Sequence, residues 1–231
     1  MKLFLTKPFP FIIFIVVFLS NCTSRHELNL EDGFSYIKNT IPTIETDIRY
    51  FGSHNFTGRP VLSYEAPVAI LSTKATLALK EVQNELKQKG LGLKVFDSYR
   101  PQRAVTSFEI WAKNINDTIA KKEFYPDIDK KDLFILKYIA SKSGHTRGST
   151  VDLTIIDLQT KQELDMGSPF DFFGTISHHN TTEITPQQKE NRELLRTTML
   201  KHGFKDYAEE WWHYTLVDEP FSDTYFDFVV K

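Results

Sequence analysis

A short stretch near the middle of the chain, residues 143–154, places a histidine and an aspartate on either side of a flexible glycine. It reads Ser-Gly-His-Thr-Arg-Gly-Ser-Thr-Val-Asp-Leu-Thr and contains His145, Gly148 and Asp152. Imidazole nitrogens and carboxylate oxygens are ordinary zinc ligands, and a catalytic zinc needs three protein ligands with one position left for water. The stretch therefore predicts half of a metal site, and the fold must bring a third ligand to it.

The third ligand is expected much further along the chain, in Glu210-Trp211-Trp212-His213-Tyr214. His213 completes a set of two histidines and one aspartate, and Glu210 can take the proton from a metal-activated water. In a regular strand, however, residues three apart point to opposite faces. Glu210 and His213 therefore converge on one metal only if a loop or bulge precedes the strand that carries His213.

The composition favours a single folded enzyme domain. The 231 residues are 41% hydrophobic and include 19 phenylalanines, 9 tyrosines and 3 tryptophans, enough for a full core. The net charge is -2, and no segment combines clustered lysine and arginine with interleaved aromatic residues, which argues against a nucleic-acid partner. The single cysteine excludes an intramolecular disulfide and a cysteine-rich zinc site.

The amino terminus indicates export. Lys2 and Lys7 precede an apolar run, residues 9–19, which is short for a membrane-spanning helix and suits a secretory signal. The run leads to Leu-Ser-Asn-Cys, ending at Cys22, which resembles a bacterial lipoprotein processing site whose cysteine is acylated. An uncleaved anchor helix and a plain signal peptide with an incidental cysteine are the alternatives. All three interpretations place the rest of the protein outside the cytoplasm, in the periplasm or at the cell surface.

After a signal peptide over residues 1–21, we expect a polar tether over 22–40 and one domain over 41–231. Apolar periodicity and capping residues predict helices over 72–89, 102–114 and 185–203, and strands over 91–96, 151–156 and 210–217. Helices mixed with separated strands predict an α+β fold with the metal ligands on neighbouring strands.

An arginine is expected where the strand over 91–96 meets the following helix. The sequence there is Asp97-Ser98-Tyr99-Arg100-Pro101, and Pro101 restricts Arg100 to an extended conformation. The guanidinium group of Arg100 is thus expected at the junction between the strand and the helix. The structural alternative is an ordinary ion pair with Asp97.

Three motifs, at residues 97–101, 143–152 and 210–213, occur in this order, and together they resemble the D-alanyl-D-alanine dipeptidases, the VanX-like zinc peptidases. These enzymes share an architecture with D-Ala-D-Ala carboxypeptidases and the hedgehog signalling domain. The similarity extends from about residue 41 to residue 220. It implies a single compact α+β domain with a mostly antiparallel central sheet flanked by helices. It also implies hydrolysis of the D-Ala-D-Ala dipeptide with one zinc ion per chain.

The resemblance assigns a role to each matching residue. The zinc ligands match His145, Asp152 and His213. The catalytic glutamate matches Glu210, and the arginine that supports the oxyanion matches Arg100. The residues that bind the free ammonium group of the dipeptide match Asp171, Tyr50 and Ser143. From the residues alone, Asp171 could instead be a loop cap and Tyr50 a core aromatic.

Two other functions stay open. The best-known relatives act in the cytoplasm, whereas an exported enzyme would recycle dipeptide released from peptidoglycan or trim other wall peptides. One alternative is therefore a D,D- or L,D-carboxypeptidase that acts on longer peptidoglycan peptides. The other is a non-catalytic lipoprotein that binds zinc or wall peptides, against which the presence of Glu210 and Arg100 speaks.

Overall fold

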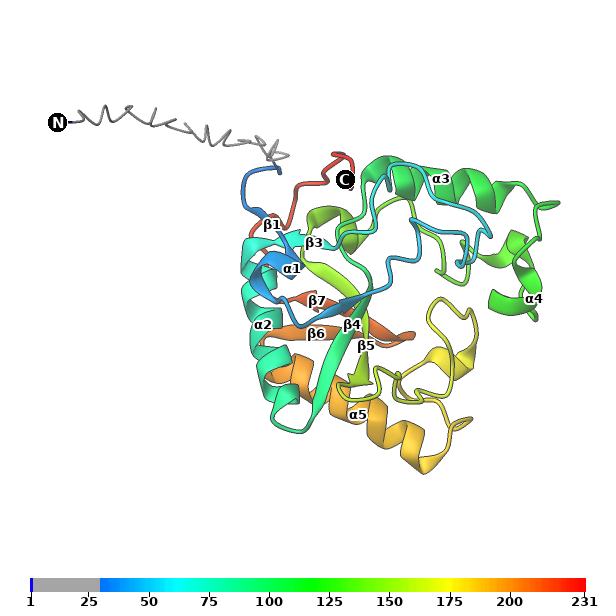
Figure 1. Ribbon diagram of the computed structural model, residues 1–231. Coiled ribbons are helices and arrows are strands. Elements are labelled where there is room, and N and C mark those ends of the chain that lie inside the picture. The colour runs from blue at the N-terminus through cyan, green and yellow to red at the C-terminus, as the bar shows by residue number, and fades with distance from the viewer. Residues whose placement is uncertain (2–29) are drawn as a thin grey trace.

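The structure is a computed structural model that describes Met1 and residues 30–231 (Figure 1). The expected signal peptide and the acylation of Cys22 fall on residues outside this part, apart from Met1, and both stay predictions. Within the described part, every helix falls short of the length and hydrophobicity that a bilayer-spanning segment requires.

A five-stranded sheet lies at the centre of the fold, with the strand order β2-β4-β5-β7-β6. Its members are β2 (Glu45–Thr46), β4 (Leu91–Asp97), β5 (Thr150–Asp157), β6 (Phe204–Tyr207) and β7 (Glu210–Leu216). Only β2 and β4 run parallel, and the other neighbours pair antiparallel. The mostly antiparallel sheet implied by the resemblance is therefore confirmed.

Two of the longer helices begin where their capping residues predict, and each ends two residues before its predicted end. In α2 (Thr73–Lys87) the Ser72 side chain accepts a hydrogen bond from a first-turn backbone N–H. In α5 (Pro186–Lys201) Thr185 and Gln188 form a complete capping box. The two helices pack against each other and against the sheet, whereas α3 (Gln102–Lys113) and the short α4 (Lys121–Phe124) lie to one side of it (Figure 1).

The folded region begins before residue 41. The strand β1 (Phe34–Tyr36) pairs antiparallel with β3 (Ile70–Ser72), and α1 (Ile37–Thr40) follows directly. Both Phe34 and Ile37 are buried in the core. The tether expected over 22–40 therefore ends before Phe34. The sequence did not indicate this boundary because a three-residue strand is too short to show periodicity.

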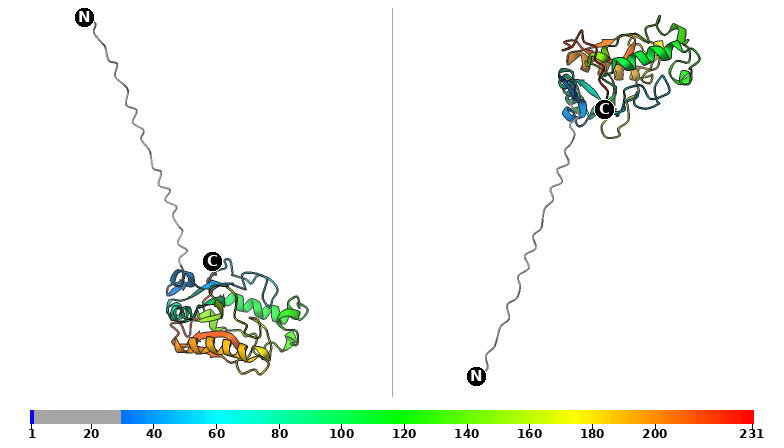
Figure 2. Two further views of the ribbon diagram at one scale, coloured as in Figure 1. Left: turned by 60° about the horizontal axis from the view of Figure 1, so that its bottom comes forward. Right: turned by 90° about the horizontal axis from the view of Figure 1, so that it is seen from above.

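The carboxyl-terminal segment, residues 217–231, returns to the amino-terminal side of the domain. Tyr36 donates a hydrogen bond from its hydroxyl to the carbonyl of Lys231 at 2.7 Å, and Figure 2 shows the C-terminus near the blue segment with which residues 30–231 begin. On the way, the backbone N–H of Phe226 bonds to the carbonyl of Thr146. The segment thus supports the 3-10 helix η2 (Gly144–Arg147), which carries His145.

Candidate active site

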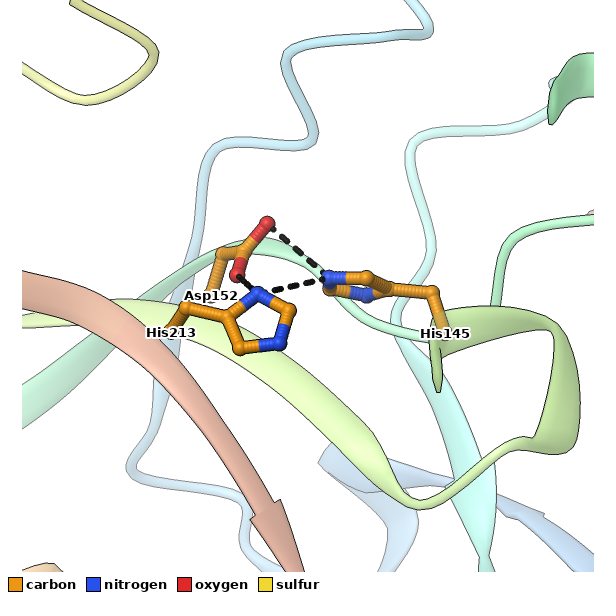
Figure 3. Close-up of side chains that lie close together, drawn as sticks. All are labelled: His145, Asp152 and His213. Carbon is orange, nitrogen blue, oxygen red and sulfur yellow. Dashed lines mark hydrogen bonds and ion pairs between the residues drawn. The ribbon is translucent and has the colours of Figure 1, made fainter. Parts of the chain in front are cut away.

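The expected metal ligands meet at one point, although they come from two strands and a short helix (Figure 3). Asp152 on β5 pairs directly in register with His213 on β7, so both side chains project from the same face of the sheet. Asp152 Oδ2 lies 3.2 Å from His145 Nε2, and Asp152 Oδ1 lies 3.0 Å from His213 Nδ1. All three ligand atoms fall within 4.8 Å of one another, close enough to share one divalent cation.

The hydrogen bonds at this point also fit a metal ion. Among the described residues, Asp152 Oδ1 is buried and accepts no well-aligned hydrogen bond, although His213 Nδ1 is near. Buried carboxylate oxygens normally have a partner, and a cation supplies one. His145 uses its other ring nitrogen, Nδ1, in a 2.7 Å contact with the Ser98 carbonyl. That contact orients the ring and leaves Nε2 for a metal.

The glycine between the first two ligands is required by its surroundings. Gly148 ends η2 with a φ of +79°, a left-handed conformation that favours glycine. A Cβ atom at this position would lie 2.1 Å from the ring of Phe34. The turn that joins His145 to the strand carrying Asp152 therefore depends on a residue without a side chain.

Without a cation, protons compete for the same atoms. Burial alone would lower the pKa of His213, but the carboxylates of Asp152 and Glu210 raise it to about 10. Burial would raise the pKa of Asp152, but the adjacent imidazoles of His145 and His213 hold it well below its usual range. A cation that binds here must displace the proton of His213, so metal binding releases a proton.

Glu210 reaches the metal ligands through an irregularity in the pairing of β6 with β7. Asp206 pairs with Tyr214 and the next residue, Tyr207, pairs with Glu210, so β7 accommodates extra residues between the two pairs. This bulge brings Glu210 Oε2 to 3.3 Å from His213 Nδ1. The register shift meets the condition that the sequence set for convergence, and Glu210 is the first residue of β7 rather than part of a preceding loop.

Arg100 lies beside the metal ligands and is held in an ion pair. Its Nε and Nη2 atoms lie 2.9 Å and 2.8 Å from Asp97 Oδ2, and Nη2 lies 3.7 Å from Asp152 Oδ2. Burial disfavours its charge, but Tyr50, Asp97 and other neighbouring acidic groups raise the pKa of Arg100 above its usual value. The ion pair considered as an alternative is therefore present, and it also aims the charged guanidinium at the metal site.

The ion pair between Arg100 and Asp97 has a further partner, Tyr64, to which the sequence assigned no role. Asp97 pairs with Arg100, and Tyr64 donates a hydrogen bond to Asp97 Oδ1 at 2.7 Å. Asp97 belongs to the same short motif as Arg100, which was a usable signal. Tyr64 comes from a distant loop with no pattern that could have identified it.

The residues expected to bind the substrate ammonium also lie together. The Tyr50 hydroxyl donates to Asp171 Oδ2 at 2.9 Å. Burial, and then the charge of Asp152, raises the pKa of Asp171 well above its usual value. Asp171 also has a φ of +62°, unusual for a residue with a side chain and frequent at functional sites. Ser143 caps η2 by accepting a hydrogen bond from the backbone of His145 at 3.3 Å.

A cavity of about 270 Å³ connects these groups. Its lining includes all of the expected site residues, namely Tyr50, Arg100, Ser143, His145, Asp152, Asp171, Glu210 and His213. Apolar walls come from Phe56, Phe108 and Phe173, and the segment 137–144 closes one side. The cavity is small and combines apolar walls with charged side chains of both signs, which suits a small polar ligand with charged ends.

The sequence matches a known family model, described as D-ala-D-ala dipeptidase, over residues 31–231. It is 43% identical to a D-alanyl-D-alanine dipeptidase of Enterococcus faecalis, over 87% of this chain and 100% of that protein. It is 42% identical to the enzyme of the same name from Streptomyces coelicolor, over 85% of this chain and 98% of that protein. The match begins before β1, in agreement with the start of the folded region.

Among solved structures, the fold is similar to a vancomycin-resistance D,D-pentapeptidase, VanY, in complex with Zn(II). The TM-score is 0.39 with 14% sequence identity, over 68% of this chain and 78% of that chain.

Proposed function

Because this chain belongs to the D-Ala-D-Ala dipeptidase family, we propose that it hydrolyses the D-alanyl-D-alanine dipeptide with one zinc ion bound by His145, Asp152 and His213. The convergence of these ligands within 4.8 Å, with a second carboxylate beside them, is the observation that carries the proposal. Two imidazoles and one carboxylate form an ordinary set of ligands for a catalytic zinc.

Two side chains perform the chemistry around the zinc. When bound, zinc supplies Lewis acidity, which acidifies water and polarises a carbonyl. Glu210, whose Oε2 lies 3.3 Å from His213 Nδ1, accepts the proton of the attacking water and returns it to the leaving amine. Arg100 stabilises the negative charge that develops on the carbonyl oxygen. Water attacks the carbonyl in this mechanism, and Ser143, the serine that lines the cavity, caps η2, so no covalent intermediate is expected.

Asp171 and Tyr50 bind the ammonium group of the dipeptide. A buried carboxyl group with a raised pKa is poorly stabilised as an anion until a cation lies beside it. The substrate ammonium supplies that cation, so its binding and the ionisation of Asp171 reinforce each other. A peptide with a blocked amino group lacks this partner, and the pocket therefore selects a free dipeptide over the end of a longer wall peptide.

Alanine release from D-Ala-D-Ala, measured with and without a chelator, tests the proposal. We expect release that stops on chelation and returns with added zinc. Binding of the dipeptide without release would favour a non-catalytic wall-peptide module. The amino-acetylated dipeptide is the control for the carboxypeptidase alternative, since a carboxypeptidase accepts it and a dipeptidase rejects it.

We also propose that the protein is exported and anchored to a membrane through an acylated Cys22, and acts in cell-wall turnover on dipeptide released from peptidoglycan. The apolar run over 9–19 and the sequence before Cys22 support this. Fatty-acid labelling of the native chain and of Cys22→Ala tests it. Label in both proteins, or in neither, would contradict acylation at Cys22.

A further inference from the structure

A buried arginine outside the metal site holds the loop that carries Asp171. Arg192 lies on α5 and is 3% exposed, and no carboxylate of the described residues forms an ion pair with it. The loop that it contacts, residues 165–178, is called the Asp171 loop below. Figure 1 shows the Asp171 loop, in yellow, beside α5 in orange.

The guanidinium of Arg192 donates to both ends of the Asp171 loop. Nε bonds to the carbonyl of Met166 at 2.5 Å, and Nη2 bonds to Ser168 Oγ at 3.3 Å, near the start of the loop. At the other end, Nη2 bonds to the carbonyl of Ile176 at 2.9 Å and Nη1 to that of His178 at 3.0 Å. Carbonyl groups cannot hydrogen-bond to one another. The planar guanidinium group, which donates to carbonyls at both ends, therefore cross-links the two ends of the Asp171 loop.

The cross-link closes the base of the Asp171 loop and leaves Asp171 near its middle. Ser168 extends the cross-link, since its Oγ lies 3.0 Å from Ser177 Oγ and also accepts from Trp211 Nε1 at 3.0 Å. Above the base, Phe170 stacks on Phe96 with ring centroids 4.9 Å apart. These contacts hold a backbone in which Asp171 keeps a left-handed φ, a conformation that persists only where the surroundings impose it.

A charged group at this position is costly to the fold. Burial lowers the pKa of Arg192 to about 10, so the guanidinium stays charged at neutral pH although no described carboxylate forms an ion pair with it. Replacement of buried ionic groups by well-packed apolar side chains is often neutral or stabilising. What an apolar side chain cannot do is bond to backbone carbonyls at both ends of one loop.

We propose that Arg192 is a positioning residue for Asp171 and thereby sets the affinity and selectivity for a substrate with a free ammonium group. This inference rests on the proposed function, in which Asp171 binds that group. Arg192 is not among the residues that line the substrate pocket, and the pairing of β5 with β7 sets the separation of Asp152 and His213. Its loss should therefore raise KM more than it lowers kcat.

The test compares Arg192→Lys with Arg196→Lys on the same helix. Arg192→Lys keeps a cation but loses the fork, whereas Arg196 contacts Asp206 rather than the Asp171 loop. In zinc-loaded full-length protein, we expect Arg192→Lys to raise KM for D-Ala-D-Ala about tenfold and to change kcat less than about threefold. The preference for the free dipeptide over its amino-acetylated form should fall in parallel. Arg196→Lys should change neither quantity.

If Arg192→Lys does not fold, Ser168→Ala is the second variant, because it removes one acceptor of the cross-link and leaves the guanidinium in place. It should raise KM about threefold at unchanged kcat and zinc content. Unchanged KM in a folded Arg192→Lys protein, or in Ser168→Ala when the first does not fold, would overturn the proposal. So would a fall in kcat with selectivity intact.

Asp171→Asn, in the same assays, separates this inference from the proposed function. If Asp171→Asn leaves KM and selectivity unchanged, the assignment of Asp171 to the ammonium group is wrong and the inference about Arg192 is wrong with it. If Asp171→Asn raises KM while Arg192→Lys does not, only the positioning role of Arg192 is wrong.

Discussion

The metal ligands and the ammonium-binding residues occupy one cavity but are held in different ways. Asp152 and His213 are directly paired residues of adjacent strands, so backbone register alone sets their separation. Asp171 lies on a loop without regular hydrogen-bond pairing, and side chains hold that loop at its base. Asp152 and His213 therefore inherit the rigidity of the sheet, whereas the position of Asp171 depends on a few contacts. Substitution of a metal ligand should therefore affect the chemical step, whereas substitution of an ammonium-binding residue should affect substrate binding.

The largest effect is expected from the loss of a metal ligand on the sheet. His213→Ala leaves only His145 and Asp152, and two ligands do not complete a catalytic zinc site. We expect no bound zinc and no detectable alanine release, with the fold retained because the neighbouring core residues are unchanged. Metal analysis of the purified protein, together with its circular dichroism, measures this. One zinc per chain in the folded variant would show that His213 is not a ligand.

Removal of the proposed proton acceptor should stop the chemistry without loss of the metal. Glu210→Gln keeps the shape of the side chain but cannot accept a proton, so kcat should fall about 10²- to 10⁴-fold. Zinc content and KM should stay close to those of the native enzyme, because the three ligands remain. Steady-state kinetics and metal analysis measure the two properties separately. A native kcat would show that Glu210 does not transfer the proton.

The difference between the strand-borne metal ligands and the loop-borne Asp171 also explains which features the sequence predicted. The metal ligands and Glu210 were found because their chemical types and spacing are local properties of two short segments. The sequence set only a condition, namely that a loop or bulge must precede the strand of His213 if Glu210 is to reach the metal. The pairing of Tyr207 with Glu210 meets that condition. Arg192 was not singled out, because a single arginine in an amphipathic helix normally faces solvent. Its role depends on a loop that approaches it only in the folded chain.

Loss of the carboxylate in the loop should weaken binding while it stabilises the fold. Asp171→Asn retains an oxygen that can accept the Tyr50 hydrogen bond but removes the charge that attracts ammonium. We expect kcat/KM to fall about 100-fold, mainly through KM. In the unfolded chain Asp171 releases its proton above about pH 4, whereas its raised pKa retains that proton in the folded protein. Ionisation of Asp171 therefore opposes folding at higher pH. Thermal unfolding at neutral pH should therefore show that the free energy of unfolding of Asp171→Asn is about 1 kcal/mol higher than that of the native protein.

The pH dependence of KM is the control for that interpretation. Below its raised pKa, Asp171 is neutral and attracts the ammonium weakly, so KM of the native enzyme should fall as pH rises through that pKa. In Asp171→Asn this dependence of KM should disappear, whereas any pH dependence of kcat should persist. If KM of Asp171→Asn depended on pH as KM of the native enzyme does, the group that titrates would be a residue other than Asp171.

The smallest effect is expected at Ser143, which belongs to both halves of the cavity. Its Oγ accepts the backbone N–H of His145 at the start of η2, and it also lines the substrate pocket. Ser143→Ala should cost about 1 kcal/mol of stability through the lost cap and raise KM about threefold. Ser143→Thr restores a hydroxyl and should recover most of the stability. Zinc content should not change in either variant, because the contact of His145 Nδ1 with Ser98 still orients the ring. Loss of zinc from Ser143→Ala would mean that the cap, and not that contact, holds His145 in place, and the metal site would then depend on its loop as much as Asp171 does.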